Sequence, residues 1–284
     1  MTVSVCTIAR GRERHLCNLI NGLAAQSLAP AELIIGAMQE EPFGNLPETP
    51  FPIRQVPVPG ERIPLAAARN VIAACARGVV LVFLDVDCVP GRDLVRTYAD
   101  ALAAVGSACV MGDTHYLAER DDIAAEGFDA LWPALAHPAR GFGPVRRRIA
   151  NPMEFWSLSF ALPRETFAQL GGFDPRFEGY GGEDTDFAMT LDAAGIPLVW
   201  APAAAALHQW HAVHIPPLHQ LDDIVRNANL FHQKHGRLCM DYWLNQFDAA
   251  GFISGMPDGP ISIRRRPLPD DLACSLQDGS VRFS

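Results

Sequence analysis

The sequence predicts an α/β protein with a mostly parallel central sheet. Strand-like apolar runs alternate with helix-like amphipathic stretches from residue 3 to residue 111, and this alternation is typical of a doubly wound sheet. The run at residues 79–84 is apolar throughout, as expected for a strand that is buried on both faces. Apolar residues make up 49% of the 284 residues, so the chain can bury a large core.

The elements of the first half can be placed in order. Strands are expected at residues 3–8, 32–35, 53–56, 79–84 and 107–111, and helices at 12–26, 64–77 and 93–105. The proline-rich stretch between the second and third strands is expected to be loop. Residues 113–150 have weak periodicity, so we expect a mobile excursion over the site that contains one short helix.

The second half is predicted to return to the sheet and then to leave it. The expected elements are a strand at 155–162, helices at 163–170 and 184–194, short strands at 197–200 and 204–208, and an amphipathic helix at 217–235. Residues 255–284 are polar and rich in proline, and are expected to form a tail that is either packed on the domain or frayed. The pattern predicts one domain over residues 1–215, followed by a helical appendage and tail over 216–284.

Composition excludes several classes of protein. A net charge of −9 argues against a general nucleic-acid binder. Seven cysteines without a C-x-x-C pair are typical of a reduced, cytoplasmic protein. The N-terminal apolar run is too short for a signal peptide, and no run approaches the roughly 18 residues of an integral membrane segment. We therefore expect a cytoplasmic protein, with peripheral attachment to the inner membrane surface as the alternative.

Two aspartates follow the buried strand at residues 79–84. Asp85 and Asp87 lie at the carboxyl end of that strand, where open α/β sheets bind their ligands. One carboxylate can reach a ribose hydroxyl or a metal-bound water, and the other can hold a divalent cation that also binds phosphate oxygens. The alternative is a simple turn, since Pro90 and Gly91 follow closely. Arg69, on the preceding helix, is either a partner for a carboxylate or diphosphate or a surface residue.

The second half carries two further groups of candidate residues. His208 and His211 form an H-x-x-H pair, and imidazoles combined with a carboxylate suit manganese better than calcium. Glu183 and Asp184 follow two glycines and are candidates for a general base, because burial would raise the pKa of a carboxylate toward neutrality. The alternatives are surface histidines and helix N-capping, respectively. Four other histidines are expected at the surface: 214, 219, 232 and 235.

Four stretches together resemble the inverting nucleotide-sugar glycosyltransferases of the GT-A fold, the broad family two. They are Val3–Arg10, Ala67–Asn70, Phe83–Asp87 and Gly171–Asp186. The last stretch is also similar to the C-terminal region of the β-1,4-galactosyltransferases. The resemblance covers roughly residues 1–215, and the order of the motifs is more specific than any one of them. It implies a single GT-A-like domain with a nucleotide-binding half at 1–112 and an acceptor and metal half at 151–215.

The resemblance also implies roles for individual residues. Asp184 would be the catalytic base, and Glu183 its neighbour at the donor and acceptor sugars. Asp87 and His211 would bind the metal, with His208 where the galactosyltransferases carry a second histidine ligand. The nucleotide side of the site would be formed by Thr7, Ala9, Arg10, Arg69, Asn70 and Asp85.

The chain departs from the family pattern at two positions. The family usually has an aspartate after the second strand to hold the base, whereas this chain reads Gly36-Ala37-Met38. Arg10 or main-chain groups are therefore expected to replace it. Thr185 stands where the galactosyltransferases have an aspartate that holds the acceptor, so a GlcNAc acceptor is not implied.

The expected activity is the metal-dependent, inverting transfer of a sugar from a UDP-sugar to a hydroxyl acceptor. Mn²⁺ is the expected cofactor, with Mg²⁺ second, and the acceptor is a glycan, a lipid-linked saccharide or a small molecule in bacterial-type glycan synthesis. The first alternative is a non-catalytic protein that binds a nucleotide sugar or a glycan. A nucleotidyltransferase ranks lower, because residues 8–14 contain no lysine and a single glycine.

Overall fold

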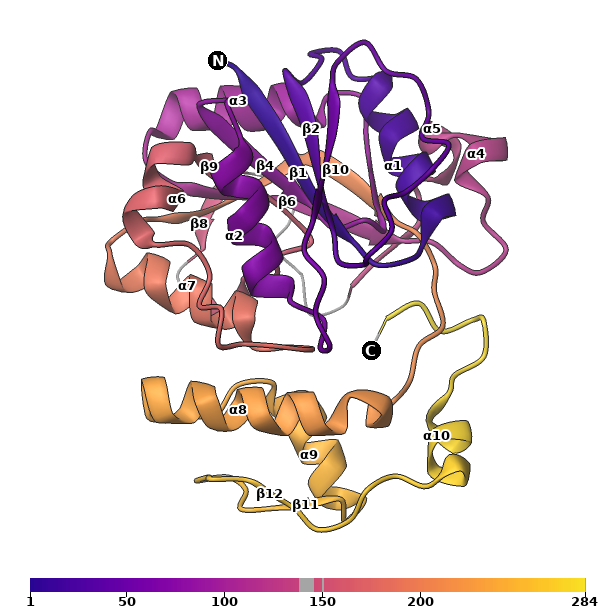
Figure 1. Cartoon of the computed structure of the whole chain (residues 1–284), viewed down its shortest axis with the longest axis vertical. Helices are drawn as coiled ribbons and strands as arrows, with labels where there is room; N and C mark the ends of the chain where they lie inside the picture. Colours follow the sequence, from indigo (N-terminus) through magenta and orange to yellow (C-terminus); the bar gives the residue numbers. More distant parts are fainter. Residues whose placement is uncertain (138–145, 150, 284) are drawn as a thin grey trace.

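A large central sheet carries the fold in this computed structural model, which describes residues 1–137, 146–149 and 151–283 (Figure 1). The strand order is β3-β2-β1-β4-β9-β6-β10-β5, with β7 beside β6 and β8 beside β10. The strands are β1 (Val3–Ala9), β2 (Glu32–Ala37), β3 (Ile53–Pro57), β4 (Val80–Leu84), β5 (Cys88–Pro90), β6 (Cys109–Tyr116), β7 (Leu135–Ala136), β8 (Arg147–Ile149), β9 (Ser159–Pro163) and β10 (Leu198–His208). The sheet is mostly parallel, as predicted, but β9 is antiparallel to β4 and β6, and β5 is antiparallel to β10.

Helices cover both faces of the sheet. They are α1 (Glu13–Ala24), α2 (Leu65–Cys75), α3 (Leu94–Val105), α6 (Arg164–Leu170) and α7 (Glu183–Ala193). Side chains alternate between the faces of a strand, so Val80 and Val82 of β4 pack in the core with α1 and α3. Leu81 and Phe83 pack in the other core, with α2, α6 and α7. This alternation also determines which layer of helices is contacted by a residue that directly follows a strand.

Three boundaries differ from the sequence prediction. Strand β6 continues to Tyr116, inside the segment expected to be an excursion, because β10 pairs with it as far as His208. Strand β10 is a single strand with an irregularity between Ala201 and Ala205, where two strands were expected. The strand expected at residue 155 begins at Ser159. The rest of the excursion contains α4 (Ile123–Glu126) and α5 (Phe128–Leu131).

The expected mobility of the excursion is untested. Residues 138–145 and 150 of it lie outside the described part of the chain. A 3₁₀-helix, η1 (Pro152–Glu154), leads from it into β9. In the described chain no helix is both long and apolar enough to span a bilayer.

The C-terminal appendage lies beyond the carboxyl ends of the parallel strands (Figure 1). It consists of η2 (Leu218–Gln220), α8 (Leu221–His235), α9 (Asp241–Ala249), β11 (Ile253–Ser254), β12 (Ser262–Ile263) and α10 (Pro269–Ser275). Leu244 and Phe247 of α9 are fully buried in a core of the appendage itself. Of the two forms expected for the tail after residue 254, the packed form is found at β12 and α10, whose Ile263 and Leu272 pack against this core.

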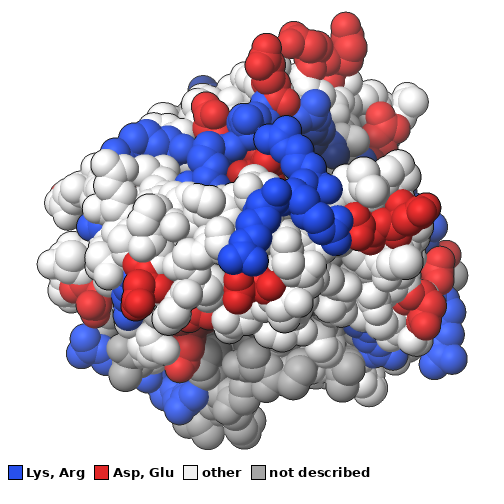
Figure 2. Space-filling view, turned by 90° about the horizontal axis from the view of Figure 1, so that it is seen from below, with Lys and Arg blue, Asp and Glu red and all other residues white. Residues whose placement is uncertain are grey.

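Charged contacts join the appendage to the sheet domain. Asp186 of α7 is 1% exposed, and its carboxylate oxygens lie 2.7 Å from Lys234 Nζ and 2.7 Å from His235 Nε2 of α8. The expectation of a surface role for His235 is therefore wrong, since its contact with the buried Asp186 carboxylate places its ring in the interface. Seen from the appendage side, Lys and Arg side chains gather in a band edged by carboxylates (Figure 2).

Candidate active site

The two aspartates after β4 face opposite layers of the molecule. The chain turns directly after the strand, where Cys88 N donates a hydrogen bond to Asp85 O over 2.8 Å. Asp85 continues the alternation of Phe83, so its carboxylate meets Arg69 of α2. Asp87 comes after the turn and meets Arg12 and His15 beside α1. The two carboxylates therefore point to opposite sides of the turn, that of Asp85 toward α2 and that of Asp87 toward α1.

Arg69 is the buried centre of the residues on the Asp85 side of the turn. Its side chain is 4% exposed, with Nη2 3.1 Å from Asp85 Oδ1 and Nη1 3.0 Å from Glu183 Oε1. Small residues of α2, such as Ala66 and Ala68, pack tightly under the sheet and bring the guanidinium inward. Burial raises the pKa of Asp85 to about 6, with the charge of Asp87 acting in the same direction and Arg69 acting against it.

Asp184 lies at the start of α7. Gly181 and Gly182 precede the helix with φ near 88°, a conformation that only glycine adopts without strain. Asp184 Oδ1 accepts a hydrogen bond from the Thr185 backbone N–H over 2.7 Å. Burial raises the pKa of Asp184 to about 7, and the negative charge of Glu183 adds to the effect. Glu183 is held by Arg69, so Asp184 is the carboxylate suited to proton transfer near neutral pH.

On the other side of the turn, Asp87 lies together with His208 and His211. One potential ligand atom from each residue lies within 4.8 Å of the other two. His208 ends β10 and His211 follows in the next loop, so the antiparallel pairing of β10 with β5 returns both to the turn that carries Asp87. A separation of 124 residues in sequence between Asp87 and His211 (211 − 87) is thus closed by the fold.

The protonation states of this cluster suit a divalent cation. Burial acts to raise the pKa of Asp87, but His15, His208 and Arg12 outweigh it and lower that pKa to about 2. Burial lowers the pKa of His208 to about 4 and also lowers the pKa of His211. Metal ligands must be deprotonated, and these three residues are so at neutral pH. His208 Nδ1 is also buried without a hydrogen-bond partner among the described residues. The residues therefore fit a metal ion.

The residues expected to line the nucleotide differ in their surroundings. Thr7 is 1% exposed, and its Oγ1 has no hydrogen-bond partner in the described chain. Ala9 packs in the core below α1, whereas Arg10 is exposed. Asn70 uses both amide atoms on Phe173, accepting from its N–H over 2.8 Å and donating to its carbonyl over 2.7 Å. Asn70 thus holds a turn, and its role at the nucleotide stays a prediction that these contacts do not support.

Sequence reasoning missed Arg12 and His15. Arg12 occupies a left-handed position just before α1 and forms an ion pair with Asp87. His15 Nδ1 lies 3.1 Å from Asp87 Oδ1, one turn into the helix. The available signal was a run of three arginines directly after the first strand: Arg10, Arg12 and Arg14.

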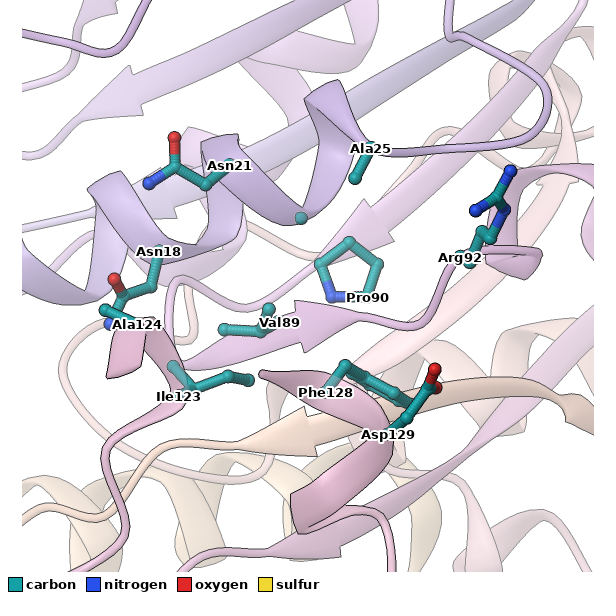
Figure 3. A pocket seen from close by; sticks show the side chains of 11 residues that line it. Asn18, Asn21, Ala25, Val89, Pro90, Arg92, Ile123, Ala124, Phe128 and Asp129 are labelled. Atoms are coloured by element: carbon teal, nitrogen blue, oxygen red, sulfur yellow. The ribbon is translucent and has the colours of Figure 1, made fainter. Parts of the chain in front are cut away.

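Two hollows flank α1. One of about 580 Å³ lies next to the cluster of Asp87, His208 and His211, and its walls include Arg12, His15 and Trp210. The other, of about 340 Å³, lies between α1 on one side and β5, α4 and α5 on the other. Figure 3 shows Asn18 and Asn21 of α1 above this second hollow, with Phe128 of α5 and Val89 of β5 across from them. The first hollow is lined by Gln209 and Trp210, the two residues between His208 and His211.

Comparison with known proteins finds similarity to glycosyltransferases. A family model described as the N-terminal domain of galactosyltransferase matches residues 138–212. Validoxylamine A glucosyltransferase of Streptomyces hygroscopicus subsp. jinggangensis is 27% identical over 201 residues, which cover 63% of this chain and 47% of that protein. The succinoglycan biosynthesis protein ExoM of Rhizobium meliloti is 27% identical over 215 residues, covering 71% of this chain and 64% of that protein. The chain spans about half the length of the first of these relatives.

Solved structures agree at the level of the fold. Staphylococcus aureus TarS 1-349 in complex with UDP-GlcNAc has a TM-score of 0.60 at 13% identity, covering 88% of this chain and 73% of that one. GalNAc-T7 with UDP, GalNAc and Mn²⁺ has a TM-score of 0.54 at 17% identity, covering 74% of this chain and 44% of that one. The fold is that of the GT-A glycosyltransferases, and the resemblance indicated by the sequence is confirmed.

Proposed function

We propose that the chain is an inverting, metal-dependent glycosyltransferase that moves a sugar from a UDP-sugar to a hydroxyl acceptor. One observation carries the proposal above all others. Arg69 joins Asp85 of the nucleotide half to Glu183, the neighbour of Asp184, while Asp87 gathers two histidines on the other side of the same turn. A general base and a cation site thus flank a single pair of aspartates.

The residues divide the work of the reaction. Asp184 takes the proton of the acceptor hydroxyl while the oxygen of that hydroxyl attacks the anomeric carbon of the donor sugar. Attack on the face opposite the leaving diphosphate inverts the configuration at that carbon. Glu183, fixed by Arg69, accepts hydrogen bonds from hydroxyl groups of the bound sugars. Asp85 accepts a hydrogen bond from a ribose hydroxyl, and Arg10 lies exposed at the nucleotide end.

Asp87, His208 and His211 are the residues that would hold a cation, with Mn²⁺ first and Mg²⁺ second. Such an ion supplies positive charge that stabilises the leaving diphosphate. Arg12 forms an ion pair with Asp87 and so adds a second positive charge beside the leaving diphosphate. His15 packs beside them and fixes the orientation of the Asp87 carboxylate. The TarS and GalNAc-T7 structures contain UDP-linked ligands or UDP, and this supports UDP as the nucleotide here.

The cellular setting is also part of the proposal. We expect the acceptor to be a glycan, a lipid-linked saccharide or a small molecule in bacterial-type glycan synthesis, and succinoglycan biosynthesis by the relative ExoM supports this. The sequence has seven cysteines without a C-x-x-C pair, and this pattern supports a reducing, cytoplasmic setting. The pKa of Asp184 near 7 favours catalysis over binding alone, because a binding site gains nothing from a carboxylate tuned to neutrality.

Hydrolysis of the donor tests the proposal without knowledge of the acceptor. A panel of nucleotide sugars is incubated with the protein, with and without Mn²⁺, and release of the nucleoside diphosphate is measured. We expect release from a UDP-sugar only with the metal, and Asp87→Ala should abolish the metal's effect while leaving the fold intact. Absence of turnover for every donor, combined with tight calorimetric binding of one of them, would instead establish the non-catalytic binding protein.

A further inference from the structure

Tyr116 lies directly beside a proposed metal ligand. Strands β6 and β10 are parallel neighbours, and their register pairs Tyr116 with His208. Paired residues project to the same face of a sheet, so the two rings meet. Their centroids lie 4.7 Å apart with an angle of 29° between the planes, and Tyr116 is 6% exposed. The last residue of each strand therefore forms one stacked pair at the edge of the site.

This contact replaces the usual support of a metal-binding histidine. Such a histidine normally donates the N–H of its second ring nitrogen to a carboxylate, carbonyl or water, and this fixes its orientation. The ring of His208 makes no hydrogen bond to any described residue. The ring of His208 is instead held by its stacking on Tyr116 and by the ring of His211, whose centroid lies 5.4 Å away.

The end of the chain braces Tyr116 from the other side. Residues 275–283, here called the C-terminal strap, run along the loop that carries His211. Ile215 N donates to Ser275 O and Gln277 N donates to Val213 O, each over 2.8 Å. The strap then crosses to β6, where the ring of Phe283 meets Tyr116 edge-on at 5.5 Å.

Two side-chain hydrogen bonds fix the far part of the strap. Trp210 Nε1, from the loop between the two histidines, donates to Val281 O over 3.1 Å. Arg282 Nη1 donates to Tyr116 O over 3.2 Å. The strap therefore contacts both elements that meet at His208, the end of β6 and the loop after β10.

We propose that Tyr116 is a positioning residue for His208, and that the C-terminal strap, through Phe283, keeps Tyr116 in place. Ion binding at Asp87, His208 and His211 then depends on a segment more than 60 residues further along the chain than His211 (283 − 211 = 72). This inference rests on the proposed function, which assigns the cation to that cluster. Tyr116 itself is not assigned a contact with substrate.

Metal affinity, not activity, is the readout that separates this role from general packing. Binding of Mn²⁺ in the presence of UDP is followed by the electron paramagnetic resonance signal of free Mn²⁺, and UDP binding without metal is measured by calorimetry. Tyr116→Leu keeps apolar volume but removes the flat ring, and is expected to weaken Mn²⁺ binding by roughly 10-fold or more, as for other supports of metal ligands. Tyr116→Phe keeps the ring and should bind Mn²⁺ like the wild type.

Two further variants complete the test. Phe283→Leu, in the half-buried strap, should weaken Mn²⁺ binding in the same direction but less, while metal-free UDP binding stays unchanged. Tyr242→Leu, at a side chain that is 61% exposed in α9, is the matched control and should change neither. If Tyr116→Leu fails to fold, Phe283→Leu decides the question.

The possible failures are distinguishable. A wild-type protein that binds UDP but no Mn²⁺ would overturn the metal role in the proposed function, and the inference with it. A wild type that binds Mn²⁺, with Tyr116→Leu or Phe283→Leu binding it equally well, would overturn the inference alone. Equal loss in Tyr116→Leu and Tyr116→Phe would show that the hydroxyl, and not ring stacking, supports the site.

Discussion

Two neighbouring carboxylates at the start of α7 behave differently because their surroundings differ. Glu183 is 6% exposed and ion-paired with Arg69, whereas Asp184 is half-buried and bonded to its own helix at Thr185. Asp184→Asn keeps the size of the side chain but removes the proton acceptor. Turnover should fall by roughly 10²–10⁴-fold with little change in UDP-sugar affinity, as is typical for the loss of a general base. Near-normal turnover in this variant, with loss in Glu183→Gln, would exchange the two roles.

The pH dependence of turnover follows from the same pair. Asp184 must be ionised to accept a proton, and its pKa is near 7, so kcat/KM should rise with pH through about 7 and level off above it. The charge of Glu183 raises the pKa of Asp184, so Glu183→Gln should move this acid limb to lower pH. The pH–rate profiles of both proteins, measured with one donor, check this. A limb that moves to higher pH would contradict the assigned electrostatics.

Arg69 combines a structural and an electrostatic role. Arg69→Met preserves volume but leaves Asp85 and Glu183 without their partner, and removal of one member of a buried ion pair typically costs about 3–5 kcal/mol. Because Arg69 acts to lower the pKa of Asp184, the acid limb should also move to higher pH. Urea unfolding and pH–rate profiles test the two effects separately. Arg176→Met, at an exposed ion pair with Asp174, is the control and should change little.

Sequence predicted the residues that depend on local pattern and missed those that depend on register. Asp85 and Asp87 were found because an apolar strand directly precedes them. Arg12 and Tyr116 were not, since their contacts with Asp87 and His208 arise only when distant strands pair. Nothing in the local sequence at Tyr116 indicates that His208 is its neighbour in β10.

At the scale of elements, α8 supports the turn that presents Asp184. Asn227 of this helix is 1% exposed, and its Nδ2 donates to the carbonyl groups of Gly181 over 2.7 Å and of Glu178 over 3.0 Å. The glycines of this turn cannot hold their own conformation, because glycine is the most flexible residue in the backbone. A side chain from the appendage therefore supplies the rigidity that the turn lacks.

Asn227→Ala should uncouple this support. We expect a loss of about 1–3 kcal/mol in the free energy of unfolding, as for buried groups left without a partner, and roughly 10-fold lower turnover at unchanged donor affinity. The same helix offers a matched control in Asn229, whose amide bonds to the backbone of Ile261 within the appendage. Asn229→Ala should cost similar stability but leave turnover alone. Equal losses of turnover in the two variants would mean that stability, not the turn, is responsible.

At the scale of the whole molecule, the alternation of strands and helices identified the sheet but not its full topology. Antiparallel β9 lies between β4 and β6, and no local feature of residues 159–163 marks its direction. The appendage was predicted from the apolar face of α8. Helix α9 was missed because the polar residues around Leu244 and Phe247 hide a short apolar stripe. Elements stabilised mainly by long-range packing are the ones that sequence reasoning leaves open.

The division into a domain over 1–215 and an appendage over 216–284 remains a proposal, and cooperativity of unfolding can test it. The appendage has a core of its own, yet Asp186 of α7, buried in the interface, pairs with Lys234 and His235 of α8. We expect that hydrogen exchange will show both parts opening together in the wild type, because opening the interface would expose this buried carboxylate.

Asp186→Asn should separate the two parts. The amide keeps the shape of the side chain but removes the charge that binds Lys234 and His235, so the interface should weaken by about 3 kcal/mol or more. Hydrogen exchange should then give a lower free energy of opening for the amides of α8 and α9 than for the amides of β1 and β4. Asp222→Asn, at an exposed ion pair of α8 with Arg266 within the appendage, is the control and should leave the two parts coupled. If the appendage already opens alone in the wild type, the two parts are independent, and α8 cannot hold the turn before Asp184 through stability of the interface alone.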